Sequence, residues 1–398
     1  MASLRDGVIR RGATWSYVIR VTDASGISRP RWVGGFPSEQ AAKKARDAAR
    51  VSASRGQFVD RSNVTVERYL TEWLDVHALE VKPKTHEGYR YLLTRYVIPH
   101  IGRQRIQSLR PSTVSALYRT LLEGGGVGGA PLSKRTVEYV HAVLRKAFND
   151  AVVTEQLLPV NPVERAKRPR HDARPRRESI WNADELRTFL GVAAGHRLFA
   201  FYRLAAYTGA RRGELLNLRW SDVTLEGAAA IRIRGTVSVV AGQRVEGTPK
   251  SGHERTVSID AETAEVLRRH RKVQEEDCAI AGDSWEGGDH VFRRQIGAPI
   301  YPDTVSALMA KLITGHNAEN PTDPLRPVRF HDLRHTHATL LLRAGVPVHV
   351  VAARLGHRDP SITLRVYAHV LADQATGAAE AFARAVDGEP TDAPEGSE

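Results

Sequence analysis

The chain has 398 residues and carries 58 Lys and Arg against 45 Asp and Glu, a formal net charge of +13 at pH 7. This length suffices for two or three domains, and the charge indicates a polyanionic partner such as nucleic acid. The single cysteine, Cys278, excludes an internal disulfide and a multi-cysteine zinc site, which favours a reducing cytoplasm. Because the chain has neither an apolar run of about 18 residues nor a signal peptide, we expect an intracellular protein without a membrane partner.

Residues 1–60 predict a small antiparallel sheet followed by a helix. Residues 15–21 alternate apolar and polar side chains, and residues 23–26 have turn composition. Residues 38–55 predict a helix capped by Ser38, with an alanine face toward the sheet (Ala41, Ala42, Ala45, Ala48 and Ala49) and a basic face outward (Lys43, Lys44, Arg46 and Arg50). The surplus of basic residues suits contact with DNA, and a solvated basic face is the plainer alternative.

Residues 61–160 predict a helical domain. Apolar side chains recur at helical spacing through residues 66–74, 85–97, 111–122 and 133–153. Thr65 and Thr85 are the expected N-caps, and the glycine-rich residues 124–129 predict a loop. Residues 161–179 hold seven Lys or Arg, three acidic residues and three prolines, so we expect a basic linker that packs in no core and crosses the DNA backbone, or else a plain solvated tether.

Residues 180–386 predict a domain of helices with a short sheet. A helix is expected to begin at residues 181–186, a buried helix over 198–207, and strands over 231–234 and 256–259, with turns at Gly242 and 251–252. A helix over 329–344 and a shorter one through Arg354 follow. Residues 387–398 are acidic and predict disorder. The expected fold class is therefore a multidomain α+β chain, mostly helical, with two small antiparallel sheets.

Six polar side chains in the second half of the chain form a chemical set suited to breaking a phosphodiester. Attack on a DNA phosphate builds negative charge on its non-bridging oxygens, so cations must surround them, and the leaving sugar oxygen needs a proton. Two arginines, a lysine and two histidines supply charge and protons, and a phenol supplies the nucleophile: Arg211, Lys250, His331, Arg334, His357 and Tyr367. We expect this chemistry to use no metal and no cofactor.

These residues, in this order, resemble those of the tyrosine recombinase family, in particular the phage-type integrases. The shared segments are TGARRGE at 208–214, TPKSG at 248–252, HDLR at 331–334, LGH at 355–357 and VYAH at 366–369. Residues 65–74, 84–89 and 161–162 are similar to the family's helical, SAM-like core-binding domain. Residues 1–60 look like an arm-site DNA-binding domain, and residues 180–386 like the catalytic domain with its DNA breaking-rejoining fold. The resemblance covers nearly the whole chain.

The resemblance implies a role for each residue that would contact the phosphate. Arg211 and Arg334 would each hold phosphate oxygens through a planar fork, which Lys does less well. Lys250, on a turn between strands, would be the general acid. Glu214, three residues after Arg211, would cap the next helix or orient an arginine.

The resemblance also implies how the phenol acts. Tyr367 would attack the phosphate and form a 3′-phosphotyrosine, which keeps the bond energy so that strand exchange needs no ATP. His331 would take or relay the Tyr367 proton, and His357 would hydrogen-bond a phosphate oxygen. Both histidines are expected to titrate near neutral pH.

Plainer explanations exist for several of these residues. Arg211, Arg212 and Lys250 are residue types common on surfaces. In an alternative hypothesis, three histidines would bind a metal ion: His331, His335 and His337. The His-Glu-x-x-His pattern is missing, and the neighbouring Arg334 would repel a cation, which argues against this hypothesis. Tyr367 would otherwise be a core residue, with Tyr207 and Tyr301 as rival nucleophiles.

We therefore expect a site-specific DNA recombinase that integrates or excises a phage or mobile element. Its partners would be double-stranded DNA, at core and arm attachment sites, and three further copies of the chain in a tetramer on DNA, with a recombination directionality factor as a further candidate. We expect it in the cytoplasm, associated with the nucleoid. The alternatives are a DNA-binding regulator with an idle catalytic site, a recombinase that resolves chromosome dimers, and a type IB topoisomerase.

Overall fold

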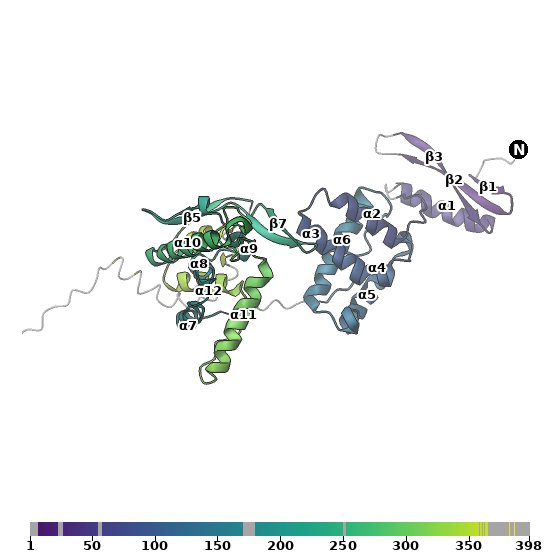
Figure 1. Cartoon of the computed structure of the whole chain (residues 1–398). Helices are drawn as coiled ribbons and strands as arrows, with labels where there is room; N and C mark the ends of the chain where they lie inside the picture. Colours follow the sequence, from purple (N-terminus) through teal and green to yellow (C-terminus); the bar gives the residue numbers. More distant parts are fainter. Residues whose placement is uncertain are drawn as a thin grey trace, which may run out of the picture. The chain divides into compact units, whose positions relative to one another are not determined.

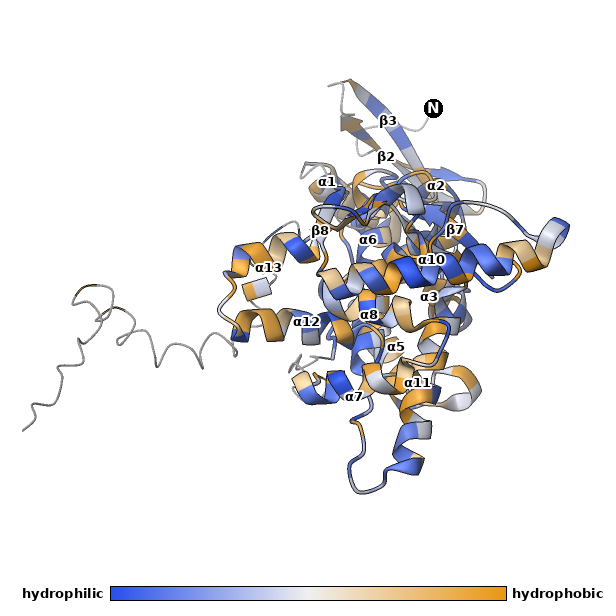
Figure 2. Cartoon of the chain, turned by 60° about the vertical axis from the view of Figure 1, so that its left-hand side comes forward, coloured by the Kyte–Doolittle hydropathy of each residue, from blue (hydrophilic) through white to orange (hydrophobic). Residues whose placement is uncertain are grey.

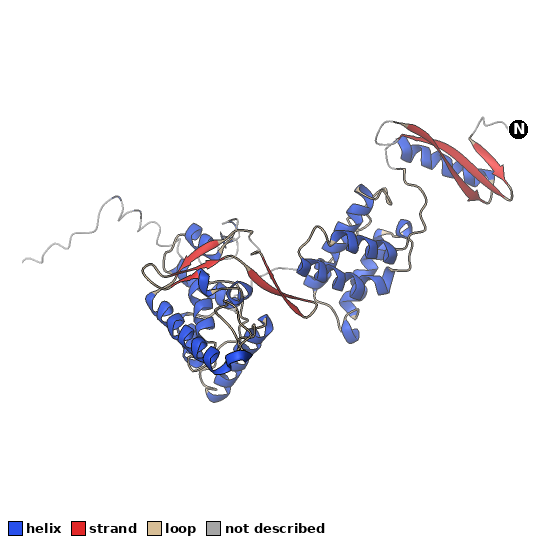
Figure 3. Ribbon diagram, turned by 45° about the horizontal axis from the view of Figure 1, so that its top comes forward, coloured by secondary structure: helices blue, strands red, loops and turns tan. Residues whose placement is uncertain are grey.

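The computed structural model describes residues 7–22, 27–54, 58–169, 180–249, 252–357, 359, 361, 363–364, 382 and 386. The chain divides into two compact units, Met1–Ala173 and Arg174–Glu398. Helices dominate both units, and strands occur as small sheets at the start of the first unit and within the second (Figures 1 and 3). No helix among the described residues is long and apolar enough to cross a membrane.

The first unit opens with the expected antiparallel sheet and helix. Strands β1 (Val8–Arg11), β2 (Thr14–Thr22) and β3 (Ser28–Phe36) pair in that order, and α1 (Glu39–Ser54) packs against them. Ser38 caps α1 as predicted, because its Oγ accepts a hydrogen bond from the Ala41 N–H at 3.2 Å. The predicted turn at residues 23–26 lies outside the described residues.

The predicted faces of α1 are wrong at two positions. Ala48 is exposed, whereas Arg46 is buried. The Arg46 guanidinium donates to the Asp47 carboxylate at 2.8 Å. A long side chain can bury its aliphatic part while its charged group forms an ion pair. The spacing of alanines in the sequence does not predict such a burial.

A bundle of helices with one continuous core follows. Its elements are α2 (Val66–His77), α3 (Pro83–Leu92), the π-helical turn η2 (Leu93–Val97), α4 (Ile98–Ile101), η3 (Ile106–Ser108), α5 (Pro111–Glu123), η4 (Val127–Gly129) and α6 (Lys134–Val153). Thr65 caps α2 as predicted, since its Oγ1 accepts from the Arg68 N–H. The predicted cap at Thr85 is wrong: α3 begins at Pro83, whose fixed φ suits a first helical position.

The predicted linker is wrong in its first part. Val163 and Ala166 are buried in the core of the helical bundle. The Asn161 side chain donates to the Arg145 carbonyl at 2.9 Å and accepts from the Val163 N–H at 2.9 Å. The chain is therefore packed through this stretch despite its charge. Residues 170–179 lie outside the described residues.

The second unit is built around the buried helix α8 (Phe199–Thr208), as predicted. The other helices are α7 (Ala183–Ala193), α9 (Arg212–Leu216), η6 (Trp220–Asp222), α10 (Ala261–Ala281), η7 (Gly282–Ser284), α11 (Pro302–Glu319), α12 (Asp332–Arg343) and α13 (Val348–Leu355). The α13 helix is mostly apolar (Figure 2) and buries Val351, Ala352 and Leu355. The helix predicted from residue 329 begins instead at Asp332, whose carboxylate accepts from the Arg329 N–H.

The predicted sheet of the second unit is larger than expected. Strands β4 (Val223–Thr224), β5 (Ala230–Ile233) and β8 (Arg255–Ser258) form one antiparallel sheet. The hairpin of β6 (Thr236–Val240) and β7 (Gln243–Gly247) forms another, in which only the turn at Gly242 was expected.

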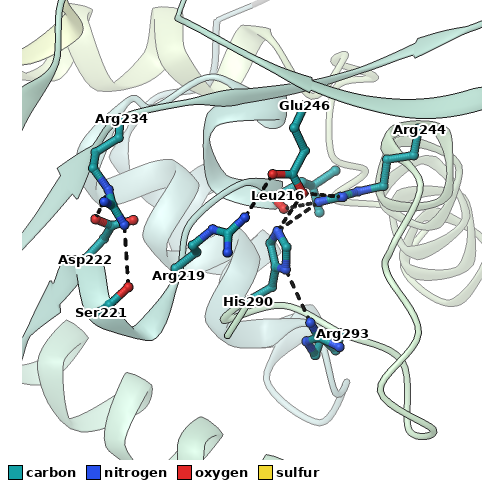
Figure 4. Close-up of polar contacts among 9 residues, drawn as sticks. All are labelled: Leu216, Arg219, Ser221, Asp222, Arg234, Arg244, Glu246, His290 and Arg293. Atoms are coloured by element: carbon teal, nitrogen blue, oxygen red, sulfur yellow. Dashed lines mark hydrogen bonds and ion pairs between the residues drawn. The ribbon is translucent and has the colours of Figure 1, made fainter. Parts of the chain in front are cut away.

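A polar network, buried at His290 and Arg293 but exposed at Glu246, anchors this hairpin to the rest of the unit (Figure 4). The Glu246 carboxylate on β7 accepts from Arg219 at 3.0 Å and from Arg244 at 2.7 Å, and lies 3.0 Å from His290 Nε2. Arginines flank both nitrogens of the His290 ring: Arg293 lies 3.3 Å from Nδ1, and Arg244 lies 3.2 Å from Nε2. The network fixes the chain where β7 ends, three residues before Lys250.

Candidate active site

Arg334, on α12, joins two turns of the chain. Its side chain is buried, with 4% of the residue exposed. Nη1 donates to the Gly209 carbonyl at 2.8 Å, and Nη2 donates to the Leu355 carbonyl at 2.7 Å. Gly209 (φ 62°) and Gly356 (φ 68°) both have left-handed backbones, which glycine adopts most readily. Arg334 thereby ties the end of α8 to the end of α13.

The first of these turns leads directly to Arg211 and Glu214. The Arg211 N–H donates to Glu214 Oε2 at 2.9 Å, and Arg211 Nη1 donates to Glu214 Oε1 at 2.9 Å. Glu214 therefore caps α9 and orients the Arg211 guanidinium at once, the two possibilities that the sequence left open. A side chain held in this way is preorganised, which an anion site requires.

A third arginine completes the surroundings of Glu214. Arg255, the first residue of β8, donates from Nη2 to Glu214 Oε2 at 2.7 Å and from Nη1 to Oε1 at 3.2 Å. Burial by itself would raise the pKa of the Glu214 carboxyl, but hydrogen bonds and charge from Arg255 and Arg211 outweigh it and lower the pKa. Glu214 is therefore a buried carboxylate that stays ionised.

The second turn presents His357 beyond the end of α13. The Gly356 N–H donates to the Ala353 carbonyl at 2.9 Å and the His357 N–H to the Ala352 carbonyl at 3.0 Å, the hydrogen-bond pair of a Schellman motif. His357 Nδ1 lies 2.6 Å from Thr363 Oγ1. The backbone of His357 is thus fixed by the helix end and its ring by a hydroxyl.

The histidines of the site have much lower pKa values than expected. Desolvation lowers the pKa of His357 to about 4, with Arg334, Arg211 and Arg255 adding to the effect. Desolvation also lowers the pKa of His331 to about 4, although the residue is exposed, and His335, Arg334 and Arg211 contribute. The prediction of titration near neutral pH is wrong for the chain without DNA, because both rings are desolvated and nearby cations lower their pKa values further.

The histidine-metal alternative does not fit the geometry. The His331 and His335 rings lie edge to face, with centroids 5.3 Å apart. Both nitrogens of His337 have partners: Nδ1 lies 2.8 Å from the Ala206 carbonyl, and Nε2 accepts from Arg354 at 3.2 Å. His337 instead lines a cavity of about 1010 Å³ together with Tyr207 and Arg354. The described residues include no group of three or more His, Cys, Asp or Glu placed to hold a metal ion.

The described part of the site carries an excess of positive charge. The guanidinium groups of Arg211 and Arg255 both bind the buried carboxylate of Glu214, and that of Arg334 lies near enough to His357 to act with them on its pKa. Asp332, next to His331, is paired with Arg329 at 3.1 Å. The four arginines and two carboxylates named here carry a net charge of +2, an arrangement that attracts a phosphate.

Comparisons with known proteins agree with this arrangement. The family model described as "Phage integrase family" matches residues 180–374, and that described as "Phage integrase, N-terminal SAM-like domain" matches residues 65–122. The chain belongs to the phage integrase family. It is a tyrosine-type site-specific recombinase, and the matched residues span both units.

Individual relatives resemble the recombinase over most of their length. A "Tyrosine recombinase XerC-like" protein of Caldanaerobacter subterraneus subsp. tengcongensis is 29% identical and covers 89% of this chain and 91% of its own. The "ICEBs1 integrase" of Bacillus subtilis is 27% identical, over 73% and 75%. The Tn1549 transposon integrase, solved with transposon right end DNA, has a similar fold, with a TM-score of 0.66, 21% identity, and coverage of 80% of this chain and 99% of that one.

Four residues predicted for the recombinase site lie together in the structure, namely Arg211, His331, Arg334 and His357. Lys250 and Tyr367 lie outside the described residues. The rival Tyr207 stacks under the Arg203 guanidinium, 4.2 Å from its ring centroid. Sequence reasoning missed Arg255, because an arginine that begins an alternating strand gives no signal of a partner 41 residues away.

Proposed function

We propose that the recombinase cuts and rejoins DNA through a 3′-phosphotyrosine on Tyr367. The observation that carries the proposal is the meeting of Arg211, Arg334, His331 and His357 at two glycine turns, with positive charge in excess. A five-coordinate phosphorus concentrates negative charge on its non-bridging oxygens, and preorganised guanidinium groups lower its energy more than they lower that of the ground state.

The proposed reaction conserves the number of phosphoester bonds. The Tyr367 phenolic oxygen attacks phosphorus as the bond to the 5′ oxygen of the next nucleotide breaks. His331, neutral before DNA binds, accepts or relays the phenolic proton, and Lys250 protonates the leaving 5′ oxygen. His357 donates to a phosphate oxygen. A 5′ hydroxyl from another strand then attacks the phosphotyrosine in the reverse sense and releases the phenol.

We propose that the reaction takes place in a tetramer bound to two DNA sites. Exchange between two duplexes involves four strands, and each chain has one such site. Double-stranded DNA at core and arm sites would be the partner, in the cytoplasm and at the nucleoid, with a directionality factor as a further partner. Integration or excision of a phage or mobile element would be the context.

We further propose that the N-terminal sheet binds arm-site DNA. The sheet face turned away from α1 carries Arg11, Arg20 and Trp32, all of them exposed. The Arg11 guanidinium lies over the Trp32 ring, 4.4 Å from its centroid. A flat basic face with an aromatic residue can contact both phosphates and base edges. Deleting residues 1–60 should spare binding to a short core duplex and weaken binding to longer attachment DNA.

The decisive experiment is covalent trapping on nicked duplexes. The wild-type chain selects substrates from a pool of random-sequence nicked duplexes, and adducts are recovered under denaturing conditions. Tyr367→Phe should bind the selected DNA with unchanged affinity and form no adduct, and the adduct peptide of the wild type should contain Tyr367. Adducts at Tyr207 or Tyr301, or none from the wild type, would refute the proposal. Full binding without any adduct would favour the idle regulator.

Metal dependence and topology separate the remaining alternatives. Adduct formation should continue in excess EDTA, whereas its loss there and return with zinc or magnesium would support the histidine-metal alternative. Relaxation of supercoiled DNA lacking the selected sequence would support a topoisomerase.

A further inference from the structure

Arg255 contacts both halves of the site although nothing in the sequence set it apart. Its side chain is 10% exposed. Its two Nη atoms hold the two oxygens of Glu214, and its Nε donates to the Arg354 carbonyl at 3.1 Å. The guanidinium thus bridges the start of α9, which carries Glu214, and the last turn of α13.

The link to Glu214 determines how much charge Arg211 can offer a phosphate. Glu214 is 1% exposed and ionised, so it needs a counter-ion. Were Arg211 its sole counter-ion, the charge of this arginine would be largely neutralised before DNA arrived. With Arg255 paired to the same carboxylate, one guanidinium charge balances Glu214 and the other remains for an anion.

The link to α13 determines where His357 lies. Arg255 holds the Arg354 carbonyl, and its side chain fills the space beside Gly356 so closely that an added Cβ there would lie 2.8 Å from Nη1 and 2.9 Å from Cδ and Cζ. The Schellman turn at Gly356 is therefore packed against the Arg255 guanidinium. His357 follows that turn directly.

We propose that Arg255 is a positioning residue for DNA cleavage. It neutralises Glu214, so that Arg211 keeps its charge for the scissile phosphate, and it fixes the turn that presents His357. The inference rests on the proposed function of the site. Arg255 itself does not contact the reacting atoms, and acts through Glu214 and through the end of α13.

Two substitutions of Arg255 and one control substitution test this positioning role. Arg255→Gln removes both the charge and the fork, and Arg255→Lys keeps the charge but loses the bidentate geometry. Arg232→Gln is the matched control: Arg232 lies on the neighbouring strand β5 and also donates twice to one carboxylate, that of Glu254 at 3.0 and 2.6 Å, but both side chains are half exposed.

Single-turnover adduct formation on the selected nicked duplexes is the first readout. Arg255→Gln should slow it about 10- to 100-fold with DNA affinity within about twofold of wild type, since affinity depends on many phosphate contacts. Arg255→Lys should fall between, and Arg232→Gln should match the wild type. Adding Glu214→Gln to Arg255→Gln should recover about tenfold of the lost rate, because no carboxylate then competes for Arg211.

The recovery distinguishes positioning from mere support of the fold. A purely structural pair would predict that the double variant regains stability, because no buried carboxylate is then short of a counter-ion, but does not regain rate. Recovered stability without recovered rate would overturn the inference. Two further outcomes would overturn the inference. One is a wild-type rate of adduct formation in a folded Arg255→Gln variant, and the other is a loss of DNA affinity that parallels the loss of rate.

A second readout needs no cleavage. In the free chain, Arg255→Gln should raise the titration midpoint of the His357 ring in NMR spectra, since a nearby cation is lost, and Arg232→Gln should leave it unchanged. If the wild type forms no adduct but the midpoint moves as stated, the proposed function fails and the positioning stands. An unmoved midpoint would refute the positioning whatever the cleavage result.

Discussion

Replacing Gly356 by alanine should destabilise the second unit more than the same change at any open glycine turn. Gly356 has φ 68°, a backbone that costs an L-residue about 1–2 kcal/mol. The added Cβ would also displace Arg255, which holds Glu214 through two hydrogen bonds and the Arg354 carbonyl through one. Breaking a buried, charged pair costs about 3–5 kcal/mol, so displacing Arg255 without breaking the pair completely should cost about 2–3 kcal/mol. Together with the backbone term, we expect a total loss of about 3–5 kcal/mol.

Gly345 provides a matched control within the same unit. It follows α12 as Gly356 follows α13, with φ 79° and the same Schellman hydrogen bonds, from Gly345 N–H to Leu342 and from Val346 N–H to Leu341. An added Cβ at Gly345 meets nothing within 4 Å. Gly345→Ala should therefore cost only the backbone term, about 1–2 kcal/mol. The entropy lost by the unfolded chain is the same in both variants and cancels.

Differential scanning calorimetry of the full chain measures the difference. For a unit of this size, 1 kcal/mol corresponds to about 2–4 °C. The transition of the second unit should therefore fall by roughly 10 °C in Gly356→Ala and by roughly 4 °C in Gly345→Ala. Equal shifts in the two variants would show that Gly356 is required only for its backbone, and that its packing against Arg255 contributes nothing.

Three further outcomes follow from the contacts described. The His357 ring of the free chain should titrate near pH 4 in NMR spectra. Since the pKa of His357 is lower in the folded chain than in the unfolded one, the free energy of unfolding should fall as the pH drops from about 6.5 toward 4. A titration midpoint of the ring above pH 6 would contradict the desolvation argument. Glu214→Gln should lower the midpoint of urea unfolding by an amount equivalent to about 3 kcal/mol, with the slope m unchanged. An unchanged midpoint would mean that Arg211 and Arg255 need no counter-ion. Tyr69→Phe removes a buried hydrogen bond to the Ala147 carbonyl and should cost about 1 kcal/mol by the same assay; a gain in stability would disprove it.

Local patterns in the sequence predicted the elements that local forces determine. Helical spacing and side-chain caps identified α2, α6 and α8, because their hydrogen bonds and buried faces repeat along the sequence. The predicted strands 231–234 and 256–259 differ from β5 and β8 by a single residue at each end. The order of charged and phenolic residues identified the family.

Features that depend on distant partners were not predictable in this way. The β6–β7 hairpin has no clean alternation, and the Glu246 network draws on residues as distant as Arg293 to hold it. The buried position of Val163 in a basic, proline-containing stretch depends on helices formed earlier in the chain. Histidine pKa values likewise depend on which arginines fold around the rings, which composition does not specify.

The two turns that Arg334 fastens together, at Gly209 and Gly356, lie 147 residues apart in the sequence. A polypeptide still being translated, in which the last helices have not yet left the ribosome, holds the Gly209 turn without its fastening partner. Such a nascent chain lacks the arrangement of Arg211, Arg334 and His357 on which the proposed cleavage depends. If the proposed mechanism holds, strand cleavage has to wait until α12 and α13 have been synthesised.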